Sequence, residues 1–155
     1  MDLTEGGIRV PYIVRWPKVV PPDAISKQLI ITMDWMPTII DAADTSSDPN
    51  IRIDGVSLLE HLQNPTEQFE RDLFWRMKYR NQKAYRTGDW KYLSIEGNEY
   101  LFNLAIDARE RANQALNQPE KLTEMREHFK DWEANIPPIP DDASVTLVYS
   151  KRDMP

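Results

Sequence analysis

The sequence predicts an α/β segment that changes to an α+β fold along the chain. Three observations carry this prediction: an apolar run followed by a helical pattern, four β-like runs at close spacing, and a long amphipathic helix after them. We place the end of an α/β domain at residues 1–64, a small α+β domain at residues 65–140 and a tail at residues 141–155. The length of 155 residues suits one domain and a fraction of another.

The first part is expected to hold one strand and two helices. Its strand is Val10–Trp16, whose apolar residues do not alternate strictly, as in a strand that is covered on both faces. Asp34 stands where a helix N-cap would lie, and the residues over about 35–44 repeat at a helical period. A second, short helix is expected over residues 57–63. Because a buried strand needs hydrogen-bonded neighbours, we expect a further portion of the fold to precede this strand.

The second part is expected to be an antiparallel meander covered by a helix. Short turns separate its β-like runs, which is typical of hairpins. Asn117 and Glu120 resemble a capping box, and Pro119 suits the first turn of a helix. In the tail, the stretch SVTLVYS is expected to add an edge strand. The four runs are DLFWRMKY, QKAYRT, DWKYLSI and NEYLFNLA, and the apolar stripe of the helix is Leu122, Met125, Phe129, Trp132 and Ile136.

Composition excludes several classes of function. The formal net charge of −6 argues against a nucleic-acid partner, because such a protein needs a basic surface. The chain has no cysteine, which excludes disulfides, thiolate catalysis and cysteine-based zinc sites within it. No run of 18 apolar residues occurs, so we expect no membrane span.

Few residues offer recognisable catalytic chemistry. The two histidines, His61 and His128, are expected at the surface or at the rim of the core. The sequence has no HExxH motif, no recognisable Ser-His-Asp context and no phosphate-binding glycine loop. The cation-rich stretch RMKYRNQK has two interpretations: a solvated strand edge, or a surface that faces an anionic substrate.

Five motifs follow one another over residues 3–135: EGGIRVPYIVRWP; Asp-x-x-Pro-Thr at Asp34, Pro37 and Thr38; Asp-Gly-x-Ser-Leu at Asp54, Gly55, Ser57 and Leu58; QKAYRTGDWKYL; and Asp-x-x-Glu-x-x-Asn at Asp107, Glu110 and Asn113. In this order they resemble the C-terminal third of sulfatases of the alkaline-phosphatase-like superfamily. The resemblance implies the tail of a large α/β sulfatase domain followed by a small C-terminal domain. That small domain is expected to hold a four-stranded antiparallel sheet with one packed helix.

The resemblance implies that a full-length parent hydrolyses sulfate esters of sulfated sugars or aryl sulfates. Such enzymes use calcium and a formylglycine made in a Cys/Ser-x-Pro-x-Arg motif. This chain lacks that motif, and SDPNIR at residues 47–52 misses it because its arginine comes one residue late. The family's sulfate-binding lysine would stand five residues before Glu5, just ahead of Met1. We therefore expect the isolated chain to be inactive, and calcium and formylglycine to belong to the parent, in the periplasm or outside the cell.

Within the resemblance, Arg76, Tyr79 and Arg80 are the candidate substrate-binding residues, because tyrosine and arginine suit a sulfated sugar through stacking and charge. Glu5 and Arg9 are expected to form a structural ion pair. No residue of the chain is predicted to be catalytic or to bind a metal. Two alternatives stay open: a non-catalytic interaction module that self-associates through the exposed strand 10–16, and a fragment of a related phosphodiesterase.

Overall fold

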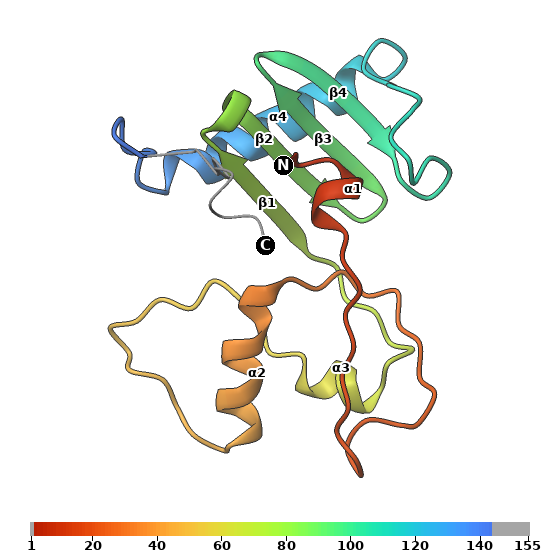
Figure 1. The fold of residues 1–155 in the computed structure, drawn as a ribbon, viewed down its shortest axis with the longest axis vertical. Helices are drawn as coiled ribbons and strands as arrows, with labels where there is room; N and C mark the ends of the chain where they lie inside the picture. The colour runs from red at the N-terminus through yellow and green to blue at the C-terminus, as the bar shows by residue number, and fades with distance from the viewer. Residues whose placement is uncertain (1, 144–155) are drawn as a thin grey trace, which may run out of the picture. The chain divides into compact units, whose positions relative to one another are not determined.

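The computed structural model describes residues 2–143, which form two compact units (Figure 1). The sheet unit comprises residues up to Val10 together with those from Asp72 onwards, and the helical unit comprises Pro11–Arg71. The sequence grouped residues 1–10 with the helices of the first part, whereas in the structure Leu3 packs into the core of the sheet unit. The predicted strand SVTLVYS lies outside the described residues.

The sheet unit is built on a four-stranded antiparallel meander in the order β1-β2-β3-β4, as the sequence predicts. Glu96 and Gly97 form the two-residue turn between the last two strands, and both have positive φ angles, 53° and 83°. Such turns match the right-handed twist of a hairpin. The strands are β1 Asp72–Met77, β2 Gln82–Thr87, β3 Trp90–Ile95 and β4 Asn98–Asn103.

One face of the sheet is covered by the long helix α4, Pro119–Ala134. Met125 and Phe129, from the predicted apolar stripe, pack there against buried residues of the strands. Pro119 occupies the first turn as expected. The predicted capping box is wrong, because Gln118 holds the N-cap position and makes no side-chain capping hydrogen bond. The buried cluster on this face is Tyr85, Tyr92, Leu101, Met125 and Phe129.

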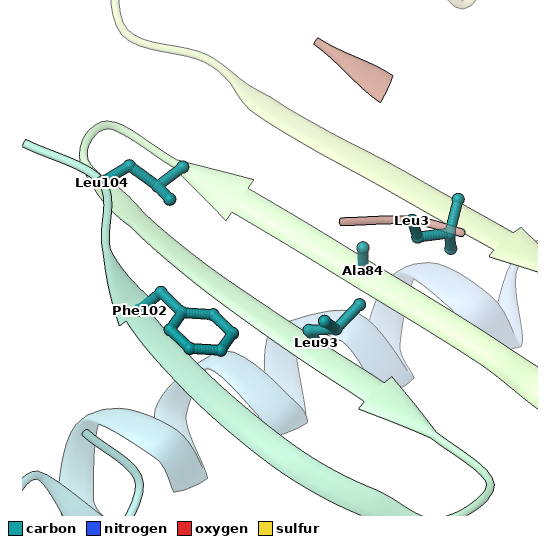
Figure 2. Close-up of a cluster of buried hydrophobic side chains, with 5 residues drawn as sticks. All are labelled: Leu3, Ala84, Leu93, Phe102 and Leu104. Atoms are coloured by element: carbon teal, nitrogen blue, oxygen red, sulfur yellow. The ribbon is translucent and has the colours of Figure 1, made fainter. Parts of the chain in front are cut away.

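The opposite face of the sheet is covered by the N-terminal segment. Figure 2 shows Leu3 of this segment beside Ala84 of β2 and Leu93 of β3, with Phe102 and Leu104 further along the same cluster. Successive residues of a strand point to opposite faces of the sheet. Neighbouring residues of the central strands therefore pack alternately into the cluster under α4 and into the cluster under the N-terminal segment. The short helix α1, Glu5–Ile8, follows directly after Leu3.

The helical unit contains a 3₁₀ turn, Thr32–Asp34, followed by α2, Trp35–Ala42, and by α3, Leu59–Gln63. Both helices lie where the sequence predicts them. The predicted strand Val10–Trp16 is wrong: residues 10–16 are not part of any strand, and the side chain of Ile13 is 89% exposed. Strand geometry is stabilised by pairing with a neighbour, and among residues 2–143 the pairing of strands is confined to β1–β4.

One charged pair should make the stability of the sheet unit depend on pH. Arg126 of α4 donates two hydrogen bonds of 2.7 Å to Glu99 of β4, and the Tyr92 hydroxyl donates a third of 2.8 Å. The Arg126 hydrogen bond, followed by that of Tyr92, holds the pKa of Glu99 below its usual value. A carboxylate with a depressed pKa stabilises the fold above the unfolded pKa of about 4.3 and loses that contribution as the pH falls through its folded pKa.

Glu99→Gln should therefore lower the free energy of unfolding by about 1 kcal/mol at pH 7, and the difference from the wild type should shrink below about pH 4. Urea unfolding at pH 7, 5 and 3 measures this. Glu127→Gln, which alters an exposed i,i+3 pair on the same helix, is the matched control and should have little effect. A Glu99→Gln penalty that stays constant from pH 7 to pH 3 would contradict the assignment.

Candidate functional site

The Glu-Gly-Gly segment is tied to the sheet by a buried carboxylate. Glu5 is 4% exposed, and its Oε1 lies 3.0 Å from Lys91 Nζ while its Oε2 lies 3.3 Å from Arg86 Nη1. The predicted Glu5–Arg9 ion pair is wrong, since β2 and β3 supply the partners. Arg86 and Lys91 face each other across this hairpin. Like charges in directly opposed positions destabilise a sheet, so this pattern in QKAYRTGDWKYL could have indicated that an acid from another segment lies nearby.

A second acid completes this cluster. Lys91 is fully buried, and its Nζ lies 2.7 Å from Oε1 of Glu110. The other oxygen of Glu110 accepts a 2.6 Å hydrogen bond from the backbone N–H of Glu5. We call Glu5, Arg86, Lys91 and Glu110 the anchor cluster. Its two carboxylates and two cations balance, as buried charges require.

The remaining residues of the Asp-x-x-Glu-x-x-Asn motif bond to the backbone. Oδ2 of Asp107 accepts from the N–H groups of Arg111 and Ala112, each at 2.8 Å. Oδ1 of Asn113 accepts from the N–H of Leu101 at 2.9 Å, which fastens the loop to β4. This motif therefore shapes the loop that presents Glu110 to the anchor cluster.

Two motif glycines stand at close backbone contacts. A Cβ atom on Gly7 would lie 2.0 Å from the carbonyl oxygen of Asp2, and one on Gly55 would lie 2.1 Å from that of Met33. Gly6 differs, because its nearest neighbour would be the Thr4 hydroxyl at 4.0 Å. In the Glu-Gly-Gly segment, only the second glycine is required by packing.

The helical unit has its own buried ion pair. Arg71 donates from Nη1 and Nη2 to the two oxygens of Asp34, at 2.5 and 3.0 Å. The same carboxylate accepts from the N–H groups of Ile31 and Val56, at 2.8 and 3.1 Å. Asp34 lies at the N-cap position of α2 as predicted, but its side chain joins neighbouring segments and makes no capping bond to this helix.

The two histidines have different environments. The sequence places His61 at the surface or at the rim of the core; in the structure it is buried, with its Nδ1 2.7 Å from the carbonyl of Glu67 and its Nε2 2.7 Å from the Ser26 hydroxyl. A carbonyl can only accept, so Nδ1 carries the proton and donates to Glu67. His128 is exposed, as expected, with Nδ1 3.3 Å from the Tyr85 hydroxyl.

The predicted substrate-binding residues lie on β1 and on the connection that follows it. Arg76, near the end of β1, donates to the carbonyl of Pro137. Arg80 lies 3.2 Å from Glu96 and 3.7 Å from Asp2, while the side chain of Tyr79 between them in sequence is 45% exposed. A ligand at this position would compete with the partners of both arginines.

Each of the two units has a hollow among its described residues. The hollow of the sheet unit has a volume of about 470 Å³ and is lined by the Glu-Gly-Gly segment, Arg9 and residues 108–110. The hollow of the helical unit, about 490 Å³, is lined mainly by apolar residues of the segment 13–16 and of α2.

Within residues 2–143, no group of three or more potential metal ligands gathers. Across the same residues, no helix has the length and apolar character needed to span a bilayer.

A family model described as N-sulphoglucosamine sulphohydrolase, C-terminal, matches residues 3–131. The chain belongs to this sulfatase family. An uncharacterized sulfatase of Schizosaccharomyces pombe is 31% identical in an alignment 155 residues long, gaps included. The alignment covers 90% of this chain and 28% of that protein. Arylsulfatase G of Rattus norvegicus is 40% identical over 70 residues, 45% of this chain and 13% of that protein.

Solved structures share the fold. A Bacteroides thetaiotaomicron protein from a locus for glycosaminoglycan metabolism superposes with a TM-score of 0.73 at 22% identity, covering 84% of this chain and 30% of that one. A protein solved in complex with its substrate D-glucosamine-2-N,6-O-disulfate superposes with a TM-score of 0.65 at 19% identity, covering 79% and 27%. The four-stranded sheet with its helix thus matches the C-terminal domain of sulfatase structures, and this chain spans less than a third of the length of these relatives.

The two glycines of the Glu-Gly-Gly segment should respond differently to the same change. Gly7→Ala should lower the free energy of unfolding by about 1–3 kcal/mol, because the new methyl group meets a backbone carbonyl that cannot rotate away. Gly6→Ala, the matched control, should change it by less than about 0.5 kcal/mol. Chemical denaturation of both variants measures the difference, and equal penalties would show that the contact with Asp2 is not what selects glycine.

The anchor cluster should behave as a coupled unit. Lys91→Met leaves Glu5 and Glu110 buried with Arg86 as their only cationic partner in the cluster, and should cost about 3–5 kcal/mol of stability. Adding Glu110→Gln to this variant should cost less than Glu110→Gln costs in the wild type, with a coupling energy of about 1–3 kcal/mol. Lys130→Met on the exposed face of α4 is the control. Additive effects in this double-mutant cycle would mean that Lys91 and Glu110 do not stabilise one another.

Proposed function

We propose that the protein containing this chain hydrolyses sulfate esters of saccharides, and that this chain is its C-terminal part. The family match over residues 3–131 carries the proposal. The fold likeness to a protein solved with D-glucosamine-2-N,6-O-disulfate supports a sulfated saccharide as the class of substrate.

In this proposal the chain completes the fold and helps to position the reaction. The anchor cluster holds the Glu-Gly-Gly segment on the sheet through Lys91 and Arg86, which fixes the position of this segment. Cleavage of a sulfate ester needs a nucleophile, stabilisation of the developing charge and an acid for the leaving oxygen. We propose that formylglycine and calcium supply part of this chemistry in the longer protein, and that this protein is exported to the periplasm or the exterior.

We also propose that Arg76, Tyr79 and Arg80 contact the saccharide. The exposed ring of Tyr79 offers a face on which a sugar can stack, and the neighbouring arginines offer charge. Since Arg80 is held by Glu96 and Asp2, binding would require a sulfate group to replace or join these carboxylates.

The test is sulfate release by the longer protein from a sulfated oligosaccharide and from a small aryl sulfate. Arg80→Ala should raise KM for the oligosaccharide about tenfold and leave KM for the aryl sulfate unchanged. The reason is that, in this proposal, only the larger substrate reaches the sheet unit. Lys130→Ala is the control variant on an exposed surface and should alter neither constant. Equal effects of Arg80→Ala on both substrates, or none, would remove Arg80 from the substrate site.

The same assay separates the proposal from its two alternatives. Turnover of a phosphodiester in place of the sulfate esters would favour a related phosphodiesterase. The alternative of a non-catalytic interaction module is favoured by one observation, the exposure of Val10 and Ile13 in the segment 10–16. Absence of any turnover, together with concentration-dependent self-association in sedimentation, would support that module.

A further inference from the structure

The hollow of the sheet unit joins two segments that lie far apart in the sequence. Thr4, Gly6 and Arg9 line one part of it, and Ala108 and Arg109 line the other. Its volume of about 470 Å³ is within the range of small-molecule sites, roughly 300–1,000 Å³. Gly6 leaves room here, because a Cβ at this position would meet only the Thr4 hydroxyl, at 4.0 Å.

The acids that line this hollow are already neutralised. Glu5 and Glu110 both reach its wall, but their side chains are only 4% and 5% exposed and contact Lys91 beneath it. Lys91 and Arg86, the two cations of the anchor cluster, offset these two negative charges, which weakens their repulsion of an anion placed in the hollow.

The cations of the hollow are exposed and available. Arg9 and Arg109 are both exposed, and within residues 2–143 neither side chain makes an ion pair or a hydrogen bond. The arginines of the stretch 76–80 differ, because each of them is occupied by a carbonyl or a carboxylate. Arg86 is likewise occupied, because its Nη1 lies 3.3 Å from Oε2 of Glu5.

We propose that the hollow between Arg9 and Arg109 binds a sulfate group of a saccharide, as a subsite separate from the Arg76, Tyr79 and Arg80 surface. A guanidinium presents a planar fork of N–H donors that matches the oxygens of a sulfate in pairs. The Thr4 hydroxyl, at the same wall, adds a group that can donate to or accept from the sugar. This subsite rests on the proposed function for its saccharide, and on this chain alone for its anion.

The test is calorimetric titration of the 155-residue chain at constant ionic strength with a sulfated disaccharide, its desulfated counterpart and inorganic sulfate. The sulfated disaccharide should bind, and the desulfated one should bind at least about tenfold more weakly. Arg9→Ala and Arg109→Ala should each weaken binding of the sulfated disaccharide about tenfold, as expected for the loss of a charge-assisted hydrogen bond. Arg111→Ala, an exposed arginine of the same loop that does not line the hollow, is the matched control and should leave binding unchanged.

Three results would overturn the subsite: no binding by the wild type, the same affinity in the Arg9→Ala/Arg109→Ala double variant, or an equal loss in Arg111→Ala. If inorganic sulfate binds as tightly as the sulfated disaccharide, the proposal that the site recognises a saccharide would be wrong, and the site would bind the bare anion only. The titration involves no turnover, so its failure is distinct from failure of the proposed function. If the longer protein releases sulfate but the sulfated disaccharide does not bind to this hollow, only the proposed subsite is wrong and the proposed function stands.

Discussion

The sheet unit depends on one buried ammonium group, Lys91, which lies between the carboxylates of Glu5 and Glu110. These three side chains come from β3, from the N-terminal segment and from the loop after β4, so a single cation joins three parts of the chain. Burying a charge is costly unless it is paired and hydrogen-bonded. The cluster meets this condition because Arg86 and the backbone N–H of Glu5 complete its partners.

The helical unit also contains a buried charged group, but there the central charge is negative. There the buried centre is the carboxylate of Asp34, with Arg71 and two backbone N–H groups as its donors. Both units thus use a motif carboxylate to fix segments that have little regular structure of their own. A buried ion pair is weak evidence for high stability, but removing one partner is strongly destabilising. Such residues therefore define which segments lie together.

Because these motif carboxylates have structural roles, other residues are better candidates for binding a ligand. The carboxylates of the motif residues Glu5, Asp34 and Glu110 are buried or nearly so, and each one contacts a cation of the scaffold. Arg9 and Arg109 stand beside two of these residues and remain exposed. Ligands bind to groups that are not already used to hold the fold together. Membership of a family therefore establishes the fold, whereas the substrate has to be argued from the site.

The sequence by itself determined the four strands, the helix α4 and the family of the chain. These features depend on local patterns: short turns between β-like runs, an apolar stripe at a helical period, and motifs in a fixed order. Only the tertiary structure decided that Val10–Trp16 is no strand, that Glu5 pairs with Lys91 and Arg86 instead of Arg9, and that His61 is buried. The reason is physical. A strand requires a hydrogen-bonded neighbour, an ion pair requires two segments to meet, and burial requires a covering surface, and each of these comes from residues distant in the sequence.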